Sequence, residues 1–230
     1  MVPGRDLAQT RPAERADLRA SALEVAPTLL GAVLITSLAD GEVALRVTEV
    51  EAYHGLGTGA VPDPGSHARM GPTARNATMW GEPGHLYVYL SHGIHSCVNV
   101  VCGPAGVAGG VLLRAGEVIA GSDIARRRRT LRGVVRADRD LARGPGRLGD
   151  AVGLRHALHD GIDAIEGVPL GGATARLLLP AAPPAPVVSG PRVGVAGVAG
   201  GPEYPWRFWI GGDPTVSAFR WGRGAAPTVV

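Results

Sequence analysis

Residues 42–53 read EVALRVTEVEAY, a run that predicts a long β-strand and decides the fold. The Asp40-Gly41 turn signal precedes this run, and residues 31–36 before the turn predict a partner strand. Further strands are expected at residues 85–90, 97–102 and 110–113, with a flexible turn at 103–109. The pattern favours a curved, mainly antiparallel sheet.

The remaining segments predict helices and closing strands around this sheet. Helices are expected at residues 17–30, at 122–132 with Ser122-Asp123 as the cap, and after Gly146. Loops or connections are expected at the Gly/Pro-rich residues 55–71 and at the Pro-rich residues 181–188. Closing strands are expected at Val193, 207–210 and 216–219. We therefore expect a flexible N-terminal tail over residues 1–16 and one α+β domain over residues 17–230, with helices flanking the sheet.

The composition is that of an ordinary globular protein. A chain of 230 residues with 45% hydrophobic and 19% charged residues forms one domain with a sizeable core. No apolar run reaches the ~18 residues of a membrane span, and the polar N-terminus has no signal-peptide core. Two cysteines, Cys97 and Cys102, do not make a disulfide framework. We expect a cytoplasmic protein without a membrane partner.

All 23 cationic side chains are arginine, and the chain has no lysine. A GC-rich coding sequence explains this bias together with the 35 glycines and 19 prolines. Whatever the origin of the bias, no lysine amine is available to form a Schiff base with a sugar aldehyde.

The strand at residues 42–53 places polar groups on one face. Successive side chains alternate, so Glu49, Glu51 and Tyr53 share one face while Val50 and Ala52 share the other. Two acids beside a tyrosine indicate either a solvated strand face or a catalytic site. In the second case Glu51 is a general base.

Other candidate residues also allow two interpretations. His67 is either a surface histidine or part of a site, since it lies in the loop 55–71. Tyr87 and Tyr89 alternate along a strand, a pattern that core packing also produces. Arg114 marks a sheet edge or holds water against a carboxylate, and Asn99 is a strand amide that needs partners.

Two clusters remain ambiguous. His92, His95, Cys97 and Cys102 are zinc-ligand types, but their spacing lacks the paired C-x-x-C knuckle, so we expect no metal. The basic residues on the helix after residue 122 indicate a solvated face or phosphate binding, and we favour a supporting role. This basic run comprises Arg126 to Arg129, Arg132, Arg136 and Arg139.

Eight segments carry a family resemblance. They are VTEVEAY (47–53), SHARMGPTARN (66–76), PGHLYVYLSHG (83–93), CVNV (97–100), VLLRA (111–115), GPGRL (144–148), PRVG (191–194) and WRF (206–208). In this order they resemble the alkyladenine (3-methyladenine) DNA glycosylase family over roughly residues 20–220. The resemblance implies that Glu51 activates water with the help of Arg114. It also implies that Tyr53 packs on a flipped base, with His67 and Tyr89 as opposite walls of the pocket.

The resemblance assigns two further residues, Asn99 and His92. Asn99 would oppose the exocyclic amine of normal guanine. Tyr87, on the same strand face as Tyr89, is expected to hydrogen-bond behind the pocket. A DNA-inserting hairpin is expected near residues 88–100. His92 stands where the family usually carries a tyrosine that wedges into the duplex, which is the main departure from the pattern.

The implied function is excision of alkylated or deaminated purines from duplex DNA by base flipping and water attack, leaving an abasic site. We expect a monofunctional, monomeric enzyme without a cofactor, associated with the nucleoid when bound to DNA. The lesions 3-methyladenine, 7-methylguanine, ethenoadenine and hypoxanthine are not distinguished. The alternatives are a non-catalytic nucleic-acid-binding module of the same fold and a metal-dependent hydrolase that uses the His/Cys cluster.

Overall fold

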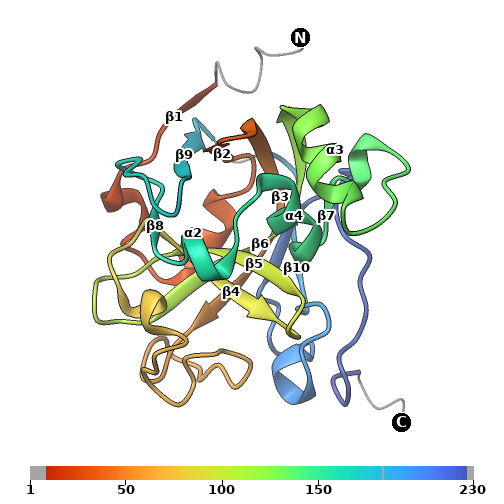
Figure 1. Cartoon of the computed structure of the whole chain (residues 1–230). Coiled ribbons are helices and arrows are strands. Elements are labelled where there is room, and N and C mark those ends of the chain that lie inside the picture. Colours follow the sequence, from red (N-terminus) through yellow and green to blue (C-terminus); the bar gives the residue numbers. More distant parts are fainter. Residues whose placement is uncertain (1–8, 183, 227–230) are drawn as a thin grey trace.

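The computed structural model describes residues 9–182 and 184–226, and its strands form one curled antiparallel sheet (Figure 1). The order along the sheet is β1-β9-β2-β3-β6-β5-β4-β8, with β7 beside β6 and with β11 beside both β3 and β10. The strands in chain order are β1 (Thr10–Pro12), β2 (Val33–Leu38), β3 (Gly41–His54), β4 (His85–Ser91), β5 (His95–Val101), β6 (Gly109–Ala120), β7 (Ala142–Arg143), β8 (Ile162–Asp163), β9 (Thr174–Pro180), β10 (Val187–Gly190) and β11 (Arg207–Ile210).

Strand β3 organises the sheet. One of its edges pairs with β6 along most of its length. The other edge is shared, because β2 pairs with the first half of β3 and β11 with the second half. The expected turn joins β2 to β3 at Asp40-Gly41, where Gly41 has a φ of 123°, a conformation that favours glycine. The half of β3 that carries the two glutamates is therefore enclosed by β6 and by a strand from the C-terminal part.

Helices α2, α3 and α4 cover one face of this sheet, η2 packs on the other face beside Tyr87, and α3 and α4 group together on one side of the view in Figure 1. The helices are η1 (Arg15–Leu18), α2 (Ala22–Thr28), η2 (Ala77–Trp80), α3 (Ser122–Thr130), η3 (Asp138–Asp140), α4 (Pro145–Val152), α5 (His156–His159) and η4 (Gly197–Gly200). Val50 and Ala52 are fully buried in the same core as residues of α2 and α4. The expected alternation along β3 is confirmed, since the glutamates point to the opposite face.

Most expected elements are confirmed, and several are corrected. The helix expected over 17–30 is split into η1 and α2, because Ser21 forms a capping box with Glu24 and starts a new helix. Helix α3 begins after Gly121, which makes no side-chain cap, rather than with Ser122-Asp123 as the cap. Of the closing strands only 207–210 forms one, whereas Val193 and residues 216–219 lie in irregular segments.

The N-terminal boundary is also corrected within the described residues. Thr10–Pro12 form β1, which pairs with β9, and Arg15 bonds to Asp163 at 2.6 Å. The expected tail over residues 1–16 is therefore folded from Thr10 onward, while residues 1–8 lie outside the described part. None of the helices in residues 9–182 and 184–226 is long and apolar enough to cross a membrane.

Candidate active site

Three of the predicted site residues, Glu51, Asn99 and Tyr87, lie in one row of paired positions across the sheet. Arg207 on β11 pairs with Glu51 on β3, Glu51 with Leu112 on β6, Leu112 with Asn99 on β5, and Asn99 with Tyr87 on β4. Directly opposed residues on antiparallel strands project to the same face and lie roughly 5 Å apart. Residues far apart in the chain are therefore brought to one face, opposite the helical layer.

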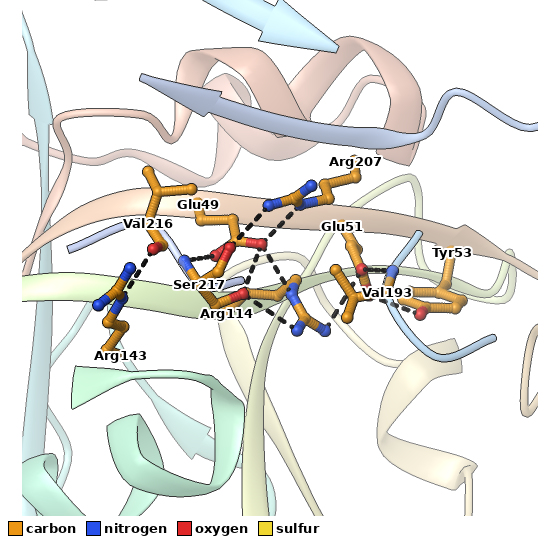
Figure 2. A network of polar contacts seen from close by, with 9 residues as sticks. All are labelled: Glu49, Glu51, Tyr53, Arg114, Arg143, Val193, Arg207, Val216 and Ser217. Atoms are coloured by element: carbon orange, nitrogen blue, oxygen red, sulfur yellow. Dashed lines mark hydrogen bonds and ion pairs between the residues drawn. The ribbon is translucent and has the colours of Figure 1, made fainter. Parts of the chain in front are cut away.

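A β-bulge places Arg114 between two glutamates, as Figure 2 shows. The pairing steps from Val50↔Leu113 to Glu49↔Ala115, so Arg114 is the extra residue on β6. Its Nε lies 3.0 Å from Glu49 Oε1 and its Nη1 lies 3.3 Å from Glu51 Oε1. Both glutamates are 0% exposed and Arg114 is 7% exposed. The strand-edge interpretation of Arg114 is wrong, because the guanidinium is buried between two carboxylates.

Glu51 is oriented by donors from three different segments. Its Oε1 accepts a 2.6 Å hydrogen bond from the Val193 backbone N–H and lies near Arg114, and its Oε2 accepts a 2.8 Å bond from the Tyr53 hydroxyl. A carboxylate oxygen accepts about two hydrogen bonds, so Oε2 has capacity for one more donor. The solvated-face interpretation of Glu51 is wrong, since the side chain is buried among partners.

Glu49 has a different environment from Glu51. Its carboxylate accepts bonds from Arg207 Nε at 2.6 Å, from Arg114 Nε at 3.0 Å, and from the Ser217 N–H and hydroxyl at 2.7 and 2.9 Å. Three of these bonds end on Oε1 and one, from the Ser217 N–H, ends on Oε2. Glu49 therefore anchors Arg114, Arg207 and the C-terminal segment.

Burial and the Glu51 charge keep the Tyr53 hydroxyl protonated, against the opposing effect of Arg192. Desolvation and the neighbouring Glu51 carboxylate raise the pKa of Tyr53 well above its usual value. The Arg192 guanidinium lies 4.5 Å from the Tyr53 ring centroid and is held by Asp63 at 2.9 and 2.7 Å. Burial lowers the pKa of Arg114, but Glu51 and Glu49 outweigh it, so the pKa is raised and the guanidinium stays charged.

Three aromatic rings lie beside these groups. Tyr87 and Tyr89 are stacked with ring centroids 5.4 Å apart, and the His67 ring meets Tyr89 edge-on at 4.6 Å. The Tyr87 hydroxyl lies 3.3 Å from His67 Nδ1. Partial burial, with Arg75 and Arg69 nearby, lowers the pKa of His67, so its imidazole is neutral at pH 7. His67 and Tyr89, expected as opposite walls, are thus in direct contact.

Asn99 and His92 lie on the β4–β5 hairpin. Asn99 is 4% exposed, and its Nδ2 donates a 3.0 Å bond to the Tyr87 carbonyl oxygen, which fixes the amide across the two strands. His92 is exposed in the hairpin turn and adopts a φ of 50°, with Ser91 Oγ 2.9 Å from its Nδ1. Asn99 therefore belongs to the buried row, whereas His92 projects from the turn at the end of the hairpin.

Comparison with known proteins shows the family of this chain. The family described as Methylpurine-DNA glycosylase (MPG) matches residues 16–214. This chain belongs to that family. It is 53% identical over 202 residues to a protein of Leifsonia xyli subsp. xyli, covering 87% of this chain and 89% of the relative. It is 52% identical over 198 residues to one of Streptomyces avermitilis, covering 86% and 87%. It is 48% identical over 206 residues to one of Cutibacterium acnes, covering 89% and 98%. All three carry the name "Putative 3-methyladenine DNA glycosylase".

The structure of this methylpurine-DNA glycosylase family member shows where the two ambiguous clusters lie, the His/Cys residues and the basic run after residue 122. Within residues 9–182 and 184–226, no group of three or more His, Cys, Asp or Glu side chains could hold a metal ion. In the basic run, Arg128 pairs with Asp40 at 2.9 and 2.6 Å, and Arg129 donates to the Leu141 carbonyl oxygen at 3.0 Å. Both arginines are buried. Arg128 and Arg129 are therefore engaged within the fold, and the supporting role of the rest of the run stays a prediction.

Several contributors to the site were not assigned from the sequence. The Val193 N–H donates to Glu51, but a backbone donor leaves no signal in the residue type. Ser217 and Arg207 hold Glu49, and Arg192 lies against Tyr53 while it pairs with Asp63. Arg192 and Arg207 both lie within segments of the family resemblance, so those motifs were the available signal.

Proposed function

We propose that this DNA glycosylase hydrolyses the bond between deoxyribose and alkylated or deaminated purines in duplex DNA and leaves an abasic site. The observation that carries the proposal is the buried Glu51 carboxylate, whose Oε2 accepts, among the described residues, only the Tyr53 hydroxyl and is able to accept a water molecule. Removing a carboxylate from water costs several kcal/mol, and the proposed proton transfer accounts for the burial of Glu51.

In the proposed reaction Glu51 acts on one water molecule. The water oxygen forms a bond to C1′ of the sugar, the C1′–N bond to the base breaks, and the carboxylate takes the water proton. The bonding electrons leave with the base. The anionic carboxylate also stabilises the oxocarbenium-like transition state, as acids do at sugar centres. Arg114 and the Val193 N–H hold Oε1, so Oε2 is the oxygen that faces the water.

The proposed base pocket uses Tyr53, His67 and Tyr89. A flat ring held between two walls needs roughly 7 Å between them, since each face contact spans about 3.5–4 Å. His67 and Tyr89 are 4.6 Å apart, so a flipped purine would displace the His67 ring from Tyr89. The His67 side chain is exposed, so its ring can turn away while the buried neighbours Ser66 and Ala68 hold the backbone. A cationic alkylated base gains extra attraction from the aromatic faces.

Two further properties complete the proposal. Asn99, fixed by Tyr87, would oppose the N2 amine of guanine, and His92 would fill the gap that the flipped nucleotide leaves. The enzyme would be monofunctional and need no cofactor, because water is the nucleophile and the chain has no lysine, and it would act as a monomer.

The test measures free base released from duplex oligonucleotides that contain 3-methyladenine, 7-methylguanine, ethenoadenine or hypoxanthine, with a chelator present. We expect at least one free base together with an abasic site. Lesion binding without release of any base would instead support the non-catalytic module. Release that the chelator abolishes would support metal-dependent hydrolysis. Either of these outcomes would overturn the proposal.

A further inference from the structure

A surface next to the hairpin turn has no part in the proposed reaction. Residues 131–136, here called the α3 loop, follow α3 directly and extend outward from the body of the protein in Figure 1. Leu131 is 84% and Val134 is 83% exposed, and Ile94 in the hairpin turn is 58% exposed. Large apolar side chains exposed to this extent and grouped together are typical of an interaction surface.

Arg132 ties the α3 loop to the hairpin. Its Nη1 donates a 2.9 Å hydrogen bond to the carbonyl oxygen of Ile94, and its Nε lies 3.6 Å from Asp150 Oδ1. Asp150 is 1% exposed and also binds Arg155 at 2.7 Å, so this anchor is buried. The loop and the hairpin turn that carries His92 are therefore held side by side.

The charge around the α3 loop is positive. Arg127, Arg136 and Arg139 are exposed and form no ion pair within the described residues. Two acids beside the loop are engaged, since Asp138 pairs with Arg126 and Asp140 pairs with Arg143. Free arginines beside exposed aliphatic side chains fit a partner that has phosphate groups and apolar sugar surfaces.

We propose that the α3 loop is a second DNA-contacting element beside the hairpin. The occupant is the duplex that flanks the flipped nucleotide, an assignment that rests on the proposed function of the hairpin. The grooves of B-form DNA are about 6–12 Å wide, so a loop bonded to the hairpin turn reaches the strands bordering the groove that the hairpin enters. Arg136 and Arg127 bind phosphates, and Leu131 and Val134 pack on the sugars or in the groove.

Two variants separate the charged and apolar contributions. Arg136→Gln removes one phosphate contact and lowers the slope of log K against log salt by about 0.9. Leu131→Ser with Val134→Ser weakens binding about tenfold, equivalent to about 1.4 kcal/mol, and leaves the salt slope unchanged. Both sites are exposed, so the variants should fold. Arg19→Gln removes an exposed arginine after η1, and Val168→Ser an exposed aliphatic side chain between β8 and β9, as matched controls.

Binding is measured by fluorescence anisotropy on undamaged and lesion-containing duplexes at several salt concentrations. Wild-type affinity and slope in both loop variants would overturn the proposal, as would equal losses in the matched controls. Single-turnover base release at saturating enzyme should stay at the wild-type rate in the loop variants. If the wild-type protein releases no base, the proposed function fails, while binding to undamaged duplex still tests the α3 loop.

Discussion

Glu51→Gln is the substitution most directly tied to the proposed chemistry. The amide keeps the size of the carboxylate and removes its ability to take a proton. Its oxygen replaces Oε1 and accepts from the Val193 N–H, while its NH2 group replaces Oε2 and faces the Tyr53 hydroxyl. The hydroxyl can rotate and accept, so the local hydrogen bonds survive. We therefore expect the variant to fold and to bind lesion DNA about as well as wild type.

The expected loss is in the rate of base release. Loss of a general base costs about 10²–10⁴-fold, which corresponds to roughly 2.7–5.4 kcal/mol of activation free energy at about 1.36 kcal/mol per tenfold. Arg114 stays paired with Glu49 at 3.0 Å, so the substitution leaves no buried cation without a partner. Single-turnover kinetics at saturating enzyme on a hypoxanthine duplex measure this rate, and thermal unfolding measures stability.

Two other acids on β3 serve as comparisons. Glu42→Gln changes an exposed carboxylate at the start of the strand and should alter neither rate nor stability. Glu49→Gln removes the anchor of Arg114 and Arg207 and should destabilise the fold by about 3–5 kcal/mol. If Glu51→Gln releases base at close to the wild-type rate, Glu51 is not the base and the reasoning from its hydrogen bonds fails.

Three further predictions concern specificity, base flipping and the nucleophile. Asn99→Ala should raise release of guanine-type bases relative to adenine-type bases, because it makes room for the N2 amine, and an unchanged ratio in competition assays would make Asn99 purely structural. His92→Ala should weaken lesion binding more than it slows the saturated single-turnover rate, and the reverse result would contradict the wedge role. Borohydride should trap no covalent protein–DNA adduct, because the chain has no lysine, and strand breaks should follow only alkali or heat; a trapped adduct would exclude water as the nucleophile.

Local patterns predicted the strands that carry the site. The Asp40-Gly41 signal and the alternation along residues 42–53 depend on backbone preferences and side-chain direction, which a short segment already expresses. Strand β9 was not predicted, although β2 and β1 both pair with it. Its identity as a strand depends on partners more than 130 residues away in the chain, and no local pattern contains that information.

The chain alone determined which chemical groups are available: a Glu-x-Glu-x-Tyr face on β3, aromatic residues on β4, an amide on β5, and cations that are all arginine. Only the tertiary structure decided that Glu51 and Glu49 differ. Both are buried carboxylates on one strand face, yet Glu49 is held by two guanidiniums and Ser217, whereas Glu51 accepts from the Tyr53 hydroxyl and the Val193 N–H beside Arg114. The difference arises because the fold brings the partners of each carboxylate from distant segments, and the residue type of a glutamate does not determine which partners it meets.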